Sequence, residues 1–384
     1  MKTKKMAAVL LALTMFLVAC GGQPAASGEA NASGEASKEA SGTVLKVCNL
    51  VNGNLGDKSF FDSAERGLKE LADAGRIELK TIEMGATDAD KPKWEQTLNE
   101  VSDSGEYDVI VLGTYQMPEF LKPAAEAHPD QKYVIYDAEH VGLPNVATLN
   151  FKQNDLGYVI GTIAGAMTKA TDVERINDKN VIGFVGGEDG PVINDFLYGY
   201  ILGAQAVNPD IKVDTRYINN FYDTAVAKEL ALSMINDKGA DIIWGVAGLA
   251  GNGGVEACQE SGKAWFIGVD SDQELTLSKE LADVTLTSGL KSIDKALVWF
   301  FDELAKGHEL YGTETILGAK EGGIGIIEDK NYQKFVPADV QEAVKKAIED
   351  ITSGAVVVPS AIGEQAKDGE TKTGAELLRD QMQP

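Results

Sequence analysis

The sequence of 384 residues predicts an α/β protein built from two similar halves. Short apolar runs alternate with helical stretches along most of the chain, and this alternation restarts near residue 152. Several runs, such as 108–113 with the sequence DVIVLG, are continuously apolar, as in parallel strands that are buried on both faces. These observations together predict parallel sheets with helices on both faces.

The N-terminus has the features of an export signal. Three lysines precede an apolar segment that is too short to span a bilayer, and Leu17-Val18-Ala19 leads directly to Cys20. The segment resembles the bacterial lipoprotein box, in which the signal (here residues 1–19) is removed and the cysteine is diacylated. The alternative is an ordinary secretion signal with a chance cysteine. Gly21 in place of an Asp favours a Gram-positive cell surface.

Residues 20–42 are rich in Gly, Ala, Ser and Glu, which predicts a flexible tether between the lipid on Cys20 and the folded part. The formal charge of −24 argues against binding nucleic acid by charge. Cys48 and Cys258 lie in apolar patterns, which favours two buried thiols over a disulfide. We expect a monomer without a cofactor or metal.

The stretch from Val44 to Leu71 predicts a strand, a turn and a helix in that order. The run 44–51 is apolar, 52–56 is a turn cluster that begins with Asn52, and apolar residues from Phe60 onward recur at helical spacing. Asp57 or Ser59 can cap the helix. Because ligands bind at the carboxyl ends of strands in such sheets, Phe60 is a candidate wall of a ligand cleft. The alternative is that Phe60 is only the first core residue of the helix.

The remaining strands of the first half end before Lys152, and one of them ends in a carboxylate. We expect these strands at 77–82, 108–113, 132–137 and 146–151, with helices at 91–104 and 118–127. Asp137 ends its strand and would point into the crevice, where it could accept ligand hydrogen bonds. A helix cap or a loop hydrogen bond is the alternative for Asp137.

In the second half, strands are expected at 180–187, 210–217, 240–246 and 265–270, the last ending in Asp270. The glycine-rich segment 247–254, which contains Gly248, is neither G-x-G-x-x-G nor a P-loop. Its glycines instead allow the backbone to approach a ligand at a helix N-terminus.

Several separate blocks of sequence carry a family resemblance. They are 56–60 (GDKSF), 144–169, 183–187 (GFVGG), 221–223 (FYD), 247–248 (AG), 268–273 (GVDSDQ) and 287–291 (TSGLK). With these blocks the chain resembles the basic membrane protein family, the nucleoside-binding lipoproteins that feed ABC importers.

The resemblance implies a type I periplasmic-binding fold with two Rossmann-like lobes and a multi-segment hinge. We expect residues 43–151 and about 275–312 in the first lobe, and 152–274 and about 313–365 in the second. Residues 366–384 would form a polar, loosely held tail, apart from a short helix near 375–379.

The resemblance also implies site residues. Phe60 and Phe221 match the two aromatic positions that sandwich a purine base, while Asp270, Lys291 and, less closely, Asp137 match the groups that hold the ribose. The chain departs from the family pattern at Phe61, where Asn is usual, and at Val51, where an Asp often reads the base. Asn49 or Asn52 could replace that Asp.

The sequence is compatible to different degrees with a transport binding protein, an enzyme and a surface receptor. A binding protein that delivers a nucleoside to an ABC permease fits all of these features. An enzyme is disfavoured because the three histidines have no obvious Ser, Cys or metal-ligand partner. A lipid-anchored surface receptor or adhesin, or a sugar ligand on the same fold, remains as an alternative.

Overall fold

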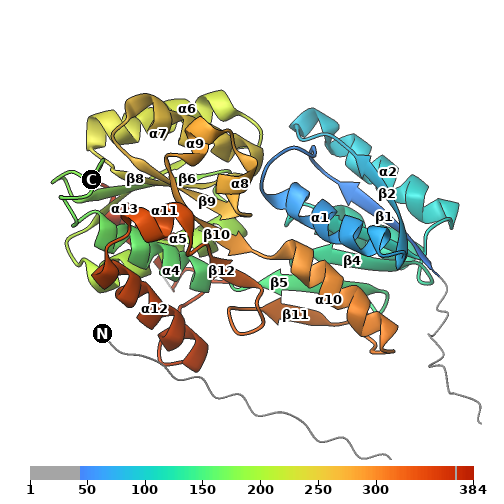
Figure 1. Ribbon diagram of the computed structural model, residues 1–384. Coiled ribbons are helices and arrows are strands. Elements are labelled where there is room, and N and C mark those ends of the chain that lie inside the picture. Colours follow the sequence, from blue (N-terminus) through green and yellow to red (C-terminus); the bar gives the residue numbers. More distant parts are fainter. Residues whose placement is uncertain (1–43, 368–369) are drawn as a thin grey trace, which may run out of the picture. The chain divides into compact units, whose positions relative to one another are not determined.

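The computed structural model describes residues 44–367 and 370–384, which contain two six-stranded sheets (Figure 1). The expected signal, Cys20 and the tether lie outside the described residues. We refer to each sheet with its covering helices as a lobe. No helix among the described residues is long and apolar enough to cross a membrane.

The first sheet has the strand order β11-β5-β4-β3-β1-β2, and its strands pair in parallel. In chain order its strands are β1 (Leu45–Val51), β2 (Ile77–Glu83), β3 (Val109–Gly113), β4 (Lys132–Tyr136), β5 (Val146–Phe151) and β11 (Glu314–Leu317). Helices α1 (Phe60–Asp73) and α10 (Ile293–Ala305) lie together on one face (Figure 1). Helices α2 (Lys91–Ser104) and α3 (Pro118–Ala127) cover the other face.

The second sheet repeats this design with the order β12-β10-β9-β8-β6-β7, in which β12 is antiparallel to β10. Its strands are β6 (Val181–Gly186), β7 (Lys212–Tyr217), β8 (Ile242–Val246), β9 (Trp265–Asp270), β10 (Thr285–Lys291) and β12 (Ile324–Ile326). Helices α4 (Gln153–Met167) and α5 (Pro191–Val207) pack on one face, while α6 (Thr224–Ser233) and α7 (Asn252–Ser261) pack on the other.

The expected division of the chain between the lobes is wrong for two strands. We expected 275–312 in the first lobe, but β10 pairs with β9 of the second sheet. We expected 313–365 in the second lobe, but β11 pairs with β5 of the first sheet. The chain therefore crosses between the sheets after β5, after β10 and after β11. An apolar run identifies a strand but does not reveal which edge the strand will join.

Helices α4 and α5 approach each other closely because glycines line their contact. A Cβ added to Gly161 would lie 2.0 Å from the backbone oxygen of Tyr200, and one added to Gly203 would lie 2.0 Å from that of Tyr158. Only glycine, which has no Cβ, allows this spacing. The two helices form a rigid base under the second sheet.

The C-terminal residues are not the loosely held polar tail that we expected. Helix α13 (Gly374–Met382) begins with a capping box between Thr373 and Glu376, and it packs on α5 and β7. Ala375 and Met382 are buried. The few apolar residues of this segment lie at helical spacing, and the predicted helix near 375–379 is part of α13. Three short helices, α8 (Gln273–Thr276), α9 (Lys279–Ala282) and α11 (Lys330–Phe335), and the longer α12 (Ala338–Ser353) complete the fold.

Candidate functional site

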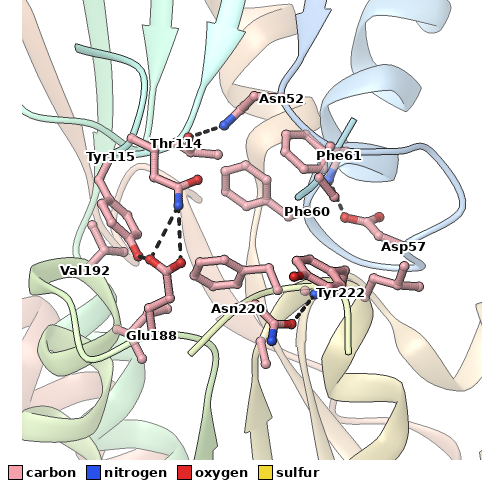
Figure 2. A pocket seen from close by; sticks show the side chains of 18 of the residues that line it. Asn52, Asp57, Phe60, Phe61, Thr114, Tyr115, Glu188, Val192, Asn220 and Tyr222 are labelled. Carbon is pink, nitrogen blue, oxygen red and sulfur yellow. Dashed lines mark hydrogen bonds between the residues drawn. The ribbon is translucent and has the colours of Figure 1, made fainter. Parts of the chain in front are cut away.

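A pocket lies where the carboxyl ends of strands from both sheets meet (Figure 2). Segments after β1, β2, β3 and β4 form the wall from the first lobe, and segments after β6, β7, β8 and β9 form the wall from the second. All eight residues that we predicted as ligand-binding line it: Asn52, Asp57, Phe60, Asp137, Phe221, Gly248, Asp270 and Lys291. Their contact with a ligand stays a prediction.

Two aromatic side chains come from opposite walls of this pocket. Phe60 begins α1, and its ring packs edge-on against Phe61 at 5.1 Å between centroids. Phe221 follows β7 in the second lobe, and its ring lies 6.3 Å from that of Tyr115 in the first lobe. Neither Phe60 nor Phe221 is fully buried. Each ring therefore combines packing on one side with access to the pocket.

Lys291 and Asp137 form a buried ion pair in the pocket. Nζ of Lys291 donates to Oδ1 of Asp137 at 2.6 Å, and the two side chains are only 2% and 7% exposed. The ammonium also lies 4.7 Å from the ring centroid of Phe196 and 5.7 Å from that of Phe60. An ammonium has three N–H donors, so this pair leaves two of them for other acceptors.

Asp270 ends β9 in a left-handed conformation, with a φ of 64°. Its Oδ2 accepts a 2.7 Å hydrogen bond from Oγ of Ser59, a residue of the first lobe. Burial raises the pKa of Asp270 to about 6, although the nearby Lys291 acts in the opposite direction. Asp270 therefore loses its negative charge at a higher pH than an ordinary Asp.

Asp57, rather than Ser59, caps α1. Its carboxylate accepts from the backbone N–H groups of Ser59, Phe61 and Asp62 at 2.8 to 3.1 Å. Burial raises the pKa of Asp57. Of the two residues that could cap the helix, Asp57 is the one that does. The hydroxyl of Ser59 instead links the lobes, because it also lies 3.2 Å from the carbonyl oxygen of Val269.

Near Val51 and Phe61, where the sequence departs from the family pattern, the pocket is lined by the amide of Asn52 and the ring of Phe61. Asn52 donates to Oγ1 of Thr114 at 2.8 Å, and its own Oδ1 has no partner among the described residues. Phe61 packs against Gly53, where an added Cβ would lie 2.2 Å from the ring. Asn49 instead donates to Glu65 and is not among the lining residues. Of the two candidate replacements for the missing Asp, only Asn52 reaches the pocket.

The glycine-rich segment supports an aromatic wall. Gly248 has a φ of 52°, and it begins a short 3₁₀ turn whose Ala250 N–H donates to the carbonyl of Phe221 at 3.0 Å. The segment therefore holds the backbone that carries Phe221. A left-handed φ at this position favours glycine.

Charged side chains of the pocket are mostly acidic. Asp57, Asp88, Asp137, Glu188 and Asp270 line it, against the cations Lys91 and Lys291. Among the residues that the structure describes, no cluster of three His, Cys, Asp or Glu side chains has the arrangement of a metal site. Hydroxyl and N–H donors are the groups that such a pocket can bind.

Comparison with known proteins identifies the family. Residues 44–359 match the family model Bmp, described as ABC transporter substrate-binding protein PnrA-like. This match covers most of the chain, both sheets and every residue that lines the pocket.

The chain belongs to the Bmp family.

The similarity between this Bmp-family protein and its relatives covers most of both chains. Basic membrane protein A of Borreliella burgdorferi is 31% identical over 83% of this chain and 88% of its own. The ABC transporter nucleoside-binding protein BmpA of Lactococcus lactis is 28% identical over 92% of this chain and 97% of its own. An ABC transporter solute-binding protein of Aeropyrum pernix has a solved structure with a TM-score of 0.71, 27% identity, and coverage of 84% of this chain and 95% of its own.

These comparisons make the Bmp-family protein a substrate-binding protein of an ABC transporter rather than an enzyme, and they confirm the type I fold. The pocket between its lobes is thus the place where a substrate would lie.

Several lining residues of this Bmp-family protein were not identified from the sequence, among them Tyr115, Gln116 and Glu188. Tyr115 follows β3 in the first lobe, and its hydroxyl donates to Oε2 of Glu188, in the loop after β6, at 2.5 Å. Nε2 of Gln116 lies 3.4 Å from both carboxylate oxygens of Glu188. These residues could have been predicted from their position just after buried strands, because the same kind of position led us to predict Asp137 and Asp270.

Proposed function

We propose that this protein binds a nucleoside in the pocket between its lobes and delivers it to the permease of an ABC importer. The observation that carries the proposal is that Phe60 and Phe221, from loops of different sheets, line the same pocket. Two aromatic faces can stack on a nucleobase whatever its identity, which contributes about 1–3 kcal/mol per base. The name of the Lactococcus lactis relative, a nucleoside-binding protein, supports the same ligand class.

The ribose would be held by the charged groups near β9 and β10. Asp270 and Asp137 can accept from vicinal hydroxyls, while Lys291 has two N–H donors left for ribose oxygens. Lys291 and Asp137 carry opposite charges and compensate each other at this buried position. In this proposal the base lies between the aromatic walls, and the sugar lies beside the charged groups at the ends of β4, β9 and β10.

The balance of charge favours nucleosides over nucleotides. Five carboxylates and two lysines line the pocket, and each lysine has a carboxylate partner, Asp137 for Lys291 and Asp88 for Lys91. A phosphate would meet uncompensated carboxylates in a site of low dielectric, where repulsion between like charges is strong.

Delivery requires the protein to stay near its permease on the outer side of the membrane. The lipoprotein box that ends in Cys20 supports a lipid anchor, and the absence of an Asp after it supports a Gram-positive surface. Two acyl chains provide stable anchoring, whereas one does not. We propose a monomer that closes on its ligand and presents the closed form to the permease.

Thermal shift of the purified full chain tests the ligand assignment. The chain is freed of bound ligand by unfolding and refolding, and it is then heated with purine and pyrimidine nucleosides, free bases, nucleotides and sugars. At a hundredfold excess over Kd, a ligand that binds only the folded state stabilises it by about 2.7 kcal/mol. We expect a shift with nucleosides and little or none with their 5′-phosphates. A shift with sugars alone, or with no compound, would overturn the proposal.

A further inference from the structure

The C-terminal helix contacts one of the loops that form the pocket. Helix α13 lies beyond the residues that match the family model, which end at 359. It is anchored at its start by Glu364, whose carboxylate accepts from the backbone N–H groups of Gly374 and Ala375 at 3.2 Å. Near its end, Met382 is buried against the second lobe. These anchors hold α13 in place without its arginine.

Arg379 of α13 joins a closed ring of four side chains. Its Nη1 donates to Oδ2 of Asp189 at 3.0 Å and to the hydroxyl of Tyr217 at 3.4 Å. Asp189 also accepts from Nδ2 of Asn194 at 2.7 Å, and Tyr217 donates to Oδ1 of Asn194 at 2.5 Å. The arginine side chain is only 14% exposed, so this ring is partly shielded from water.

The residue next to this ring is Glu188. Asp189 and Glu188 belong to the short loop 187–190, between β6 and α5. Asp189 points toward α13, whereas Glu188 accepts the 2.5 Å hydrogen bond from Tyr115 of the first lobe. The loop is therefore fixed on one side by the C-terminal helix and bonded on the other side across the pocket.

We propose that Arg379 is a positioning residue for the ligand cleft, because it holds loop 187–190 where Glu188 can bond to Tyr115 and so stabilises the closed, ligand-bound form. This inference rests on the proposed function for its ligand. The C-terminal helix is then a part of the binding apparatus that the family model does not include.

Ligand affinity of four full-chain variants tests the inference. Arg379→Ala should weaken binding of the nucleoside that gives the largest thermal shift by roughly three- to thirtyfold. Tyr115→Phe should also weaken binding, and adding Arg379→Ala to it should have little further effect, because both changes remove the same bond across the pocket. Lys346→Ala is the control, since Lys346 pairs with Asp350 within α12, neither residue lines the pocket, and the change should leave affinity unchanged. An unchanged affinity of Arg379→Ala, or an equal loss in both backgrounds, would overturn the inference.

A second measurement does not depend on a ligand. Amide hydrogen exchange in residues 186–194 should speed up in Arg379→Ala and not in Lys346→Ala, because only the first change removes the outer support of loop 187–190. If no nucleoside binds the parent protein, the proposed function fails and hydrogen exchange alone decides: unchanged protection in Arg379→Ala would overturn the positioning role.

Discussion

Lys291 and Asp137 form an ion pair of 2.6 Å although they are 154 positions apart in the chain and end strands of different sheets. Lys291 ends β10, directly before the chain crosses to α10, and Asp137 directly follows β4. One buried bond thus joins the two lobes inside the pocket.

Removing one member of this pair should cost stability. Asp137→Asn removes the carboxylate that is bonded to the buried ammonium of Lys291, and breaking a buried pair in this way costs about 3–5 kcal/mol. Asn tolerates the left-handed φ of 57° at this position, so backbone strain adds little. Urea unfolding measures the loss. The double variant Asp137→Asn/Lys291→Met should be more stable than Asp137→Asn alone. A double variant that is less stable would show that the unpaired ammonium of Lys291 is not the cause of the loss.

Ligand affinity should depend on the protonation of Asp270. Its raised pKa of about 6 means that the carboxylate gains a proton as the pH falls through 6, and it then loses acceptor capacity for ligand hydroxyls. Nucleoside Kd measured by calorimetry should therefore rise between pH 7.5 and pH 5. In Asp270→Asn this part of the pH dependence should be absent. An equal pH dependence in both proteins would assign it to another group.

Truncation of either aromatic wall should weaken binding. Phe60→Ala and Phe221→Ala should each reduce the binding free energy of a nucleoside by about 1–3 kcal/mol, because each removes one stacking face. Calorimetric titration measures the change, and circular dichroism checks the fold. Leu275→Ala, at a side chain that is 70% exposed and outside the pocket, is the control. Parent-like affinity in both phenylalanine variants would contradict the stacking role.

The contact between α4 and α5 should not tolerate a methyl group. Gly161→Ala places a Cβ 2.0 Å from the backbone oxygen of Tyr200, so the helices must move apart, and overpacking of this kind costs about 1–3 kcal/mol. Gly325→Ala is the control because no atom lies within 4 Å of its added Cβ, and it should change the free energy of unfolding by less than about 0.5 kcal/mol. Equal stability of the two variants would be evidence that the helices can separate freely.

Buried Asp241 should make the protein less stable as the pH rises. It accepts from Thr168 and from the backbone N–H of Asn177, and burial raises its pKa to about 7. Between the ordinary value of 3.8 and about 7 the folded state holds a proton that the unfolded state has released, so the free energy of unfolding falls with rising pH in this window. Urea unfolding of the parent and of Asp241→Asn at pH 5 and pH 8 should show a larger fall for the parent.

The strands and the general position of the pocket were predictable from local pattern. Apolar runs such as the one within 108–113 marked buried strands. Asp137 and Asp270 each lie at the carboxyl end of a strand in their own sheet, which is where ligands bind in such sheets, and these two ends line the same pocket. The assignment of β10 and β11 to their sheets was not predictable, since strand order depends on tertiary contacts. The bond between Tyr115 and Glu188 was not predictable either, since its two residues are 73 positions apart and meet only through tertiary contacts. Residues 366–384 were mistaken for a tail because most are polar, although the apolar ones of α13 find partners on α5 and β7.

The pairing of the late strand β11 with β5 of the first sheet has a consequence for synthesis of the chain. As the chain leaves the ribosome, β1 to β5 can pair as soon as residue 151 is available, but the strand that covers the edge of β5 comes only at residues 314–317, after the five parallel strands of the second sheet. Until then the first sheet has an unpaired edge, which is a surface for wrong pairing with other chains. Export in an unfolded form, completed before folding begins, would avoid this exposure.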